Sequence, residues 1–112
     1  GHNVTPISVA LAVDHCFRSL GVHRIEICIR PENAPSLRVV EKLGFRYEGL
    51  RRRYIHINGD WRDHFCFALV AEEVRGGVLE RWVQGQVPPG VGAVPLAARD
   101  EAAMPLDTTP RI

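Results

Sequence analysis

The feature that most restricts the fold is the Asn58-Gly59 pair between two long extended stretches of the sequence. Asn-Gly at such a place is the strongest short-range signal for a two-residue β-hairpin turn, because both residues tolerate positive φ angles. The flanking stretches, residues 45–57 and 61–70, alternate in polarity as strands do. Uninterrupted alternation divides the first stretch into two faces, Tyr47, Ile55 and Ile57 on one and Leu50 and Tyr54 on the other.

A helix, a short strand and a second helix are predicted before this hairpin. Thr5 is a typical N-cap for a first helix with apolar residues at helical spacing, and Gly21 ends it. Residues 23–30 alternate strictly, with three isoleucines on one face, and predict a strand. Asn33 can cap the second helix, which runs to about Leu43, and Gly44 then fits a left-handed C-terminal stop.

The composition limits the chain to one small domain and excludes several functions. It has 112 residues, of which 46% are hydrophobic, so a core can form, and a net charge of +1 gives no reason to expect nucleic-acid binding. The three cysteines are far apart without CxxC spacing, and no histidine pattern is typical of a metal site. No apolar run is long enough for a membrane span. We therefore expect a cytoplasmic protein without a metal.

The last 40 residues carry weaker signals. Residues 72–85 can form a short helix, although Gly76-Gly77 weakens it. Residues 86–112 contain five prolines and little periodic apolar content, so we expect a flexible Pro-rich tail without a fold of its own. The fold class is thus α/β. Because the first strand has no preceding partner, the sheet is expected to have further strands that are missing from this sequence.

The order of these elements resembles the C-terminal portion of the GCN5-related N-acetyltransferase (GNAT) fold, with its N-terminal strands missing. The composite of "PENAPSLRVVEKLGF", then "EG", then "INGDWRDH" is similar to the RimJ-type branch, which acetylates ribosomal-protein N-termini. The resemblance covers residues 1–71 as a partial acetyltransferase domain. It implies acetyl-CoA as a substrate, no metal, and direct attack of a protein N-terminal amine on the thioester.

The resemblance also implies roles for individual residues on the cofactor side. Gly1, Asn3 and Val4 correspond to the end of the loop that holds the pyrophosphate of CoA at a helix N-terminus, and the alternative is a plain chain end with a helix cap. Asn33 corresponds to a residue beside the pantetheine arm. Ser36 lies near the thioester sulfur, where its hydroxyl could protonate the leaving thiolate. The alternative for both is local helix capping.

The acceptor side is less well defined by the resemblance. Asp63 could attract a protonated amine or be partnered within the protein, and Tyr54 is a second substrate candidate. His64 is interpreted as an ordinary polar strand residue. Relatives carry a general-base glutamate at the position of Cys28 or Ile55, and Glu26 could act only through water, so no general base is assigned here. Some relatives use a tyrosine as proton donor at the position of Val40, which shifts that role to Ser36.

Two other functions remain open from the sequence. The chain could be a catalytically inactive half-domain that acts as a binding or assembly module, in which an exposed sheet edge pairs with a complementary chain or a second copy. It could also be a GNAT enzyme that acts on small amines instead of a protein N-terminus.

Overall fold

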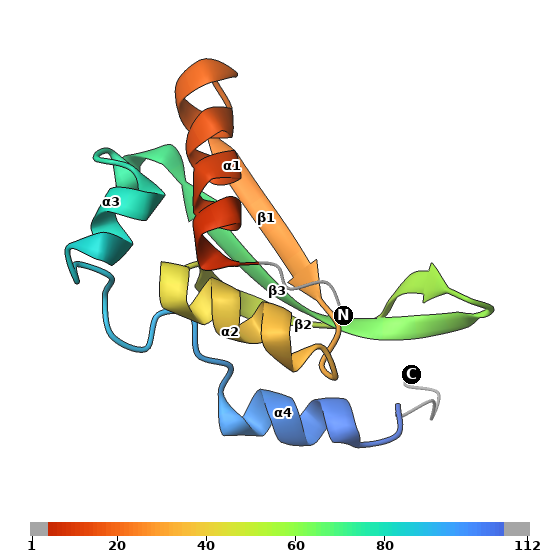
Figure 1. The fold of residues 1–112 in the computed structure, drawn as a ribbon. Coiled ribbons are helices and arrows are strands. Elements are labelled where there is room, and N and C mark those ends of the chain that lie inside the picture. The colour runs from red at the N-terminus through yellow and green to blue at the C-terminus, as the bar shows by residue number, and fades with distance from the viewer. Residues whose placement is uncertain (1–4, 107–112) are drawn as a thin grey trace.

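The computed structural model describes residues 5–106 and has a three-stranded antiparallel sheet at its centre (Figure 1). The strand order is β1-β3-β2, so β1 and β2 are the edge strands of this sheet. The strands are β1 (Arg24–Ile29), β2 (Arg46–Ile57) and β3 (Asp60–Val70). The helices are α1 (Pro6–Ser19), α2 (Ala34–Leu43), the 3-10 turn η1 (Ala71–Val74), α3 (Val78–Val83) and α4 (Leu96–Ala103).

The capping residues predicted for the first two helices are confirmed. The side chain of Thr5 accepts a hydrogen bond from the backbone N–H of Ser8 at 3.2 Å. In α2 the side chain of Asn33 accepts one from the N–H of Ser36 at 3.3 Å. Gly44 follows α2 with a φ angle of 78°, which is the left-handed conformation that favours glycine.

The hairpin turn is confirmed, but the alternation predicted for β2 is not. Asn58 and Gly59 have φ angles of 50° and 84°, as a tight hairpin turn with two positive φ angles requires. The β2–β3 pairing contains register shifts between Tyr47 and Gly49 and between Arg51 and Ile55. An extra residue in one strand reverses the parity of the strand residues after it. Tyr47 and Leu50 therefore share one face, because they oppose Phe67 and Phe65.

The hydrophobic core lies between the sheet and helices α1, α2 and α3. Isoleucines of β1 lie beside aromatic and aliphatic residues of β3, with Ile27 opposite Phe67 and Ile29 opposite Phe65. Val40 and Leu43 of α2 are part of the same buried cluster. Burial of such apolar surface contributes about 25 cal/mol per Å² and holds the first turn of α2 close to the end of β1.

Within residues 5–106, charged side chains rather than a helix cover the opposite face of the sheet. Arg24 on β1 forms an ion pair with Glu48 on β2, so the pair crosses the central strand β3. Arg46 binds both Glu48 and Glu73. Beneath these side chains Ala68 of β3 is fully buried, which shows how long charged residues can shield a strand without a covering helix.

Residues 86–106 differ from the flexible tail that we expected for residues 86–112, of which residues 107–112 lie outside the described range. Val94 is buried in the core cluster, and the backbone N–H of Tyr47 on the outer edge of β2 donates to the carbonyl of Val91 at 3.0 Å. Gly92 is packed against the end of α2. Helix α4 comes next, and two of its alanines contact the core. Few apolar residues are involved, so periodicity in the sequence gave no sign of this packing.

Residues 72–85 also form more than the single helix that we expected. The 3-10 turn η1 and helix α3 are separate, and Gly77 between them has a φ angle of 102°. Two carboxylate oxygens of Asp14 on α1 accept hydrogen bonds from the backbone N–H groups of Val78 and Leu79 at 2.6 and 3.2 Å. This contact fixes α3 against α1 and satisfies N–H groups that the start of a helix leaves unpaired.

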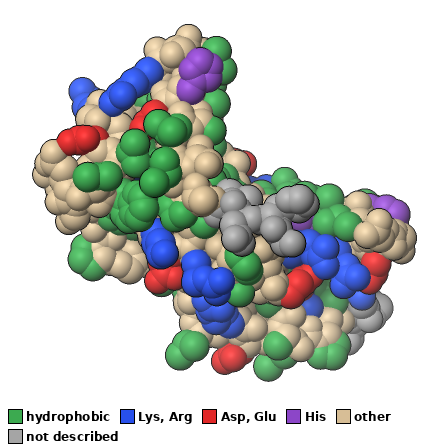
Figure 2. Space-filling model, in the orientation of Figure 1, with side chains coloured by type: hydrophobic (Ala, Val, Ile, Leu, Met, Phe, Trp, Pro, Cys, Tyr) green, Lys and Arg blue, Asp and Glu red, His purple; other side chains and the backbone are tan. Residues whose placement is uncertain are grey.

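The surface view shows hydrophobic side chains gathered over α1 and α3 and charged side chains over the start of the hairpin (Figure 2). On α1, Ile7 and Leu11 are each more than half exposed. Across the described part of the chain, no helix combines the length and the apolar character that a membrane span needs.

Candidate functional site

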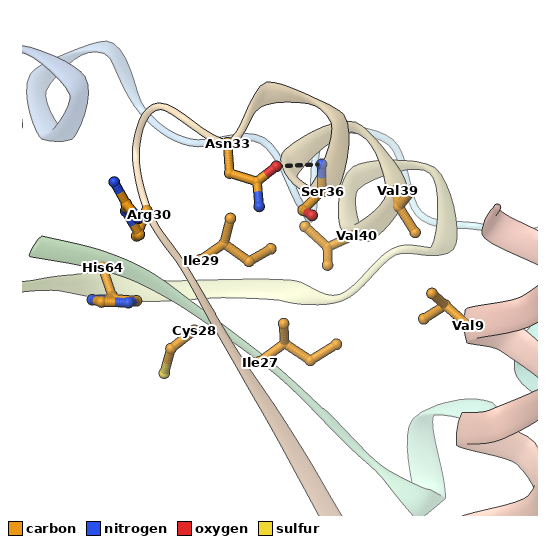
Figure 3. Close-up of a pocket in the computed structure, with 10 residues that line it drawn as sticks. All are labelled: Val9, Ile27, Cys28, Ile29, Arg30, Asn33, Ser36, Val39, Val40 and His64. Carbon is orange, nitrogen blue, oxygen red and sulfur yellow. Dashed lines mark hydrogen bonds between the residues drawn. The ribbon is translucent and has the colours of Figure 1, made fainter. Parts of the chain in front are cut away.

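A cavity of about 350 Å³ lies beside the end of β1, where the chain turns into α2 (Figure 3). Small-molecule clefts commonly enclose about 300–1,000 Å³ and combine apolar walls with a few polar groups. This cavity has the same character. The residues that line it are Val9, Ile27, Cys28, Ile29, Arg30, Asn33, Ser36, Val39, Val40 and His64.

The position of the cavity is a consequence of the sheet topology. Strand β1 pairs with β3 on one side, and among the described residues no strand pairs with its other side. The backbone N–H of Asn33 donates to the carbonyl of Arg30 at 3.0 Å, so the chain turns tightly between β1 and α2. The first turn of α2 and the free edge of β1 therefore border the same space, as Figure 3 shows.

Asn33 and Ser36 both line this cavity, as their shared helix turn requires. The oxygen of the Asn33 side chain serves as the helix cap, while its amide nitrogen points towards Ile29 (Figure 3). Ser36 is half-buried, and its hydroxyl lies on the side of α2 that carries Val40 (Figure 3). The capping role of Asn33 is thus confirmed. Contact of either residue with acetyl-CoA stays a prediction.

The remaining walls are largely aliphatic. Val39 and Val40 are buried in α2, and Ile27 and Ile29 face them from β1. Val40 occupies the position at which some relatives of the GNAT family carry a tyrosine, and only 2% of its surface is exposed. A hydroxyl group is therefore not available there, and Ser36 is the hydroxyl-bearing residue of the lining.

His64 is the functional candidate that the sequence analysis undervalued. It lies in the wall of the cavity and is only 4% exposed. Its Nδ1 lies 3.0 Å from the carbonyl oxygen of Arg62, which can only accept, so Nδ1 carries a proton. In the neutral ring Nε2 then has a free lone pair. The sequence contained one sign of this position. His64 has the same strand parity as Cys66 and Ala68, so it lies on the face of the sheet opposite to the aromatic residues of β3.

Asp63 is partnered within the protein, and its predicted attraction of a protonated amine stays a prediction. One carboxylate oxygen accepts the backbone N–H of Arg53 at 2.7 Å, and the other lies 2.9 Å from Nε of Arg52. Arg52 in turn donates to the carbonyls of Glu101 and Met104 at 3.0 and 2.6 Å. Asp63 thus supports the bulge of β2 and, through Arg52, the end of α4.

Asp63 and Tyr54 do not line the cavity that holds Asn33 and Ser36. Asp63 lies in a second hollow of about 350 Å³ between the β1–α2 loop, the hairpin and the segment after α4. Tyr54 is 41% exposed, and its hydroxyl accepts a hydrogen bond from Arg51 at 2.8 Å. Tyr54 still lies near the cavity, because its ring centroid is 6.0 Å from that of His64 in the cavity wall.

Three of the cofactor-side candidates, Gly1, Asn3 and Val4, lie outside the described residues 5–106. Their predicted contact with the pyrophosphate stays a prediction. Within the described range, no group of three or more His, Cys, Asp or Glu side chains is arranged to hold a metal ion.

Comparison with known proteins identifies relatives for this arrangement. Residues 1–46 match the family model described as an acetyltransferase (GNAT) domain. The probable N-acetyltransferase YjcK of Bacillus subtilis is 43% identical over 70 residues, which cover 62% of this chain and 39% of that protein. The [ribosomal protein uS5]-alanine N-acetyltransferase of Escherichia coli is 33% identical over 59% of this chain and 34% of its own length.

The fold agrees with solved structures of the same kind. Mycobacterium smegmatis RimJ, solved in complex with CoA-disulfide, superposes with a TM-score of 0.68 and is 41% identical. The match covers 78% of this chain and 42% of that structure. The chain thus spans about two fifths or less of the relatives that it matches. It is similar to these GNAT acetyltransferases and corresponds to part of the domain that they share.

Proposed function

We propose that this chain provides part of the active site of an acetyl-CoA-dependent N-acetyltransferase. The observation that carries the proposal is the cavity at the first turn of α2, where Asn33 and Ser36 meet the free edge of β1. The cavity is large enough for the acetylated end of the pantetheine arm and has aliphatic walls that keep water away from a thioester. Unpaired backbone groups on β1 are suited to the amides of that arm.

The proposed reaction is a direct transfer without an acyl-enzyme. The amine nitrogen of the acceptor attacks the thioester carbonyl, the C–S bond breaks, and the acetyl group moves to the amine. The hydroxyl of Ser36 donates a proton to the leaving thiolate of CoA, and the amide nitrogen of Asn33 orients the pantetheine arm. A positioned proton donor of this kind contributes about 10²–10⁴-fold to a rate.

His64 is the residue that we propose to accept the proton of the amine. Its Nδ1–H is held by the carbonyl of Arg62, which leaves Nε2 as the basic atom at the wall of the cavity. An N-terminal amine has a pKa of about 8, so a base as weak as imidazole is sufficient near neutral pH. This assignment fills the role that the sequence left open.

The acceptor that we propose is the N-terminal amine of a protein, of the ribosomal-protein alanine type, in the cytoplasm. The support comes from the uS5-alanine acetyltransferase and RimJ among the relatives. The hollow around Asp63 adjoins the β1–α2 loop and holds the carboxylates of Glu32 and Asp60, which suit a cationic peptide end. A small amine is the competing acceptor.

Ser8 offers a matched control for a test of the proposal. Ser8 and Ser36 hold the same position in their helices, since each donates its backbone N–H to the capping side chain three residues earlier. The side chain of Ser36 lines the cavity, whereas that of Ser8 is exposed on α1. Replacing either by alanine keeps the backbone hydrogen bond. Ser8→Ala also removes a hydroxyl contact with Thr5 at 2.9 Å, but only Ser36→Ala changes the lining of the cavity.

The experiment measures thermal stabilisation of the chain by acetyl-CoA and acetylation of a peptide that begins with alanine. We expect Ser36→Ala to lower turnover about 10²-fold with little change in acetyl-CoA affinity, and Ser8→Ala to change neither. Spermidine, as a small amine, replaces the peptide in a parallel assay and distinguishes the acceptors. Absence of any stabilisation at saturating acetyl-CoA would refute the proposal.

The free edge of β1 favours a second candidate, an assembly module without activity of its own. An unpaired strand edge can add a strand from another chain or from a second copy. Size measurement by light scattering across a range of concentrations tests self-association. A dimer that binds no acetyl-CoA would favour the module over the enzyme.

A further inference from the structure

Two thiols on the neighbouring strands β1 and β3 lie side by side next to the cavity. Cys28 of β1 and Cys66 of β3 are directly opposite in the antiparallel register, and their Sγ atoms are 3.1 Å apart. The proposed acetyl transfer uses neither thiol. The third cysteine, Cys16, lies on helix α1 and has no role in this pair.

The backbone geometry of this pair suits a disulfide. Residues directly opposite in an antiparallel pair have Cα atoms about 4.5–5.5 Å apart, and disulfides span Cα distances of about 4.4–6.8 Å. Both side chains point to the same face of the sheet, because they share a register position. The bond can therefore form by small side-chain rotations without movement of the strands.

The two thiols differ in access to solvent. Cys28 is half-buried and lines the cavity, so a small molecule that enters the cavity can reach its sulfur. Cys66 is 4% exposed and lies beneath its neighbours on the sheet. Burial, followed by the hydrogen bond to Cys28, raises the pKa of the Cys66 thiol to about 12. Cys66 thus stays protonated near neutral pH, where the accessible Cys28 is the better attacking group.

We propose that Cys28 and Cys66 form a redox-active dithiol site that reacts with low-molecular-weight disulfides. The Cys28 thiolate attacks one sulfur of the incoming disulfide, whose S–S bond breaks and releases one small thiolate, which takes up a proton. Cys66 then loses its proton to solvent, and its sulfur attacks Cys28. This step forms the Cys28–Cys66 bond, breaks the mixed disulfide and releases the second small thiolate, which takes up a proton from solvent. Two electrons pass from the cysteine pair to the small disulfide, which leaves as two thiols.

The proposed dithiol chemistry needs no acetyl-CoA, although Cys28 also lines the cavity proposed for acetyl transfer. It makes a distinct prediction for each cysteine. The full chain is equilibrated in glutathione buffers from fully reduced to fully oxidised, alkylated at the free thiols, and analysed by intact mass and peptide mapping. We expect the wild type and Cys16→Ala to lose two hydrogen atoms through a Cys28–Cys66 bond. Cys66→Ala is expected to accumulate one glutathione on Cys28.

Cys28→Ala tests the order of the two steps, and circular dichroism confirms that each variant is folded. In Cys28→Ala we expect Cys66 to remain unmodified at least tenfold longer than Cys28 does in the wild type. The proposal is overturned if the folded wild type keeps both thiols free in fully oxidised glutathione. Stable glutathione adducts without the Cys28–Cys66 bond, or a bond that includes Cys16, would overturn it as well. Because the wild type alone yields these outcomes, poor folding of a variant does not prevent the test.

Discussion

Replacement of Gly92 by alanine tests whether the segment before α4 is packed against the domain as the structure shows. A Cβ atom at Gly92 would lie 2.8 Å from the carbonyl oxygen of Phe45 and 2.9 Å from Cα of Glu41. Both are backbone atoms and cannot rotate away. Gly76 is the matched control, because a Cβ there meets nothing within 4 Å and the backbone has no positive φ angle.

The size of the effect depends on the two ways in which the protein can relieve this overlap. Local adjustment of a packed region typically costs about 1–3 kcal/mol. Release of the segment from α2 would expose Val94, which is 8% exposed, at a cost of about 1.5–3 kcal/mol. It would also break the hydrogen bond from Tyr47 to Val91, worth about 1 kcal/mol. Because the protein adopts the less costly of the two responses, we expect Gly92→Ala to destabilise it by about 1–3 kcal/mol.

Urea unfolding of the wild type and the two variants measures this difference, and amide exchange at Tyr47 distinguishes the two responses. If the segment is released, the Tyr47 N–H loses its partner and exchanges faster. Gly76→Ala is expected to be neutral or to stabilise the protein by about 0.4–1 kcal/mol through the unfolded state. If Gly92→Ala unfolds within about 0.5 kcal/mol of Gly76→Ala, with unchanged exchange at Tyr47, the close contact between Gly92 and α2 does not exist.

Two further predictions concern charged groups. Arg52→Met removes the donor to two carbonyls at the end of α4 and one partner of Asp63. It should lower the free energy of unfolding in urea by about 2–3 kcal/mol. The exposed Arg53→Met is the control, and equal losses in both variants would contradict the anchoring role of Arg52. Burial acts to raise the pKa of Glu73, but hydrogen bonds from Arg46 and the backbone N–H of Val70 outweigh it and keep that pKa below its usual value. A lowered folded-state pKa means that this stabilisation is present above about pH 4.5 and is lost as the pH falls through the folded pKa. The stability advantage of the wild type over Glu73→Gln should therefore shrink as the pH is lowered below about 4.5. An advantage that stays constant with pH would show that the Glu73 charge has no part in it.

Local sequence was sufficient for the elements that have short-range causes. Thr5 and Asn33 specify helix starts, Gly44 a helix end, and Asn58-Gly59 a hairpin, because each acts on backbone groups within a few residues. The composite motif around Asn33 also predicted the resemblance to GNAT acetyltransferases, which the comparisons confirm. The roles of Asn33 and Ser36 towards acetyl-CoA stay predictions, although both residues line one cavity.

Contacts between distant parts of the chain were decided by tertiary structure alone. The bulges of β2 depend on its pairing with β3, so a count of alternating residues could not detect the reversal of parity after Gly49. The burial of His64 in the cavity wall and the apposition of Cys28 and Cys66 depend on the register between strands that are far apart in the sequence.

The C-terminal segment also shows the difference between what local sequence determines and what tertiary packing determines. Its composition predicted a tail without structure, since five prolines and few apolar residues cannot build a core of their own. In the folded chain, Val94 needs only a place in a core that already exists, Gly92 needs only a close backbone approach, and Arg52 binds the end of α4. The sequence by itself determined the helix caps, the turn and the resemblance to GNAT acetyltransferases, because these depend on neighbouring residues. The packed tail, the buried histidine and the thiol pair arise only when the sheet brings distant residues together.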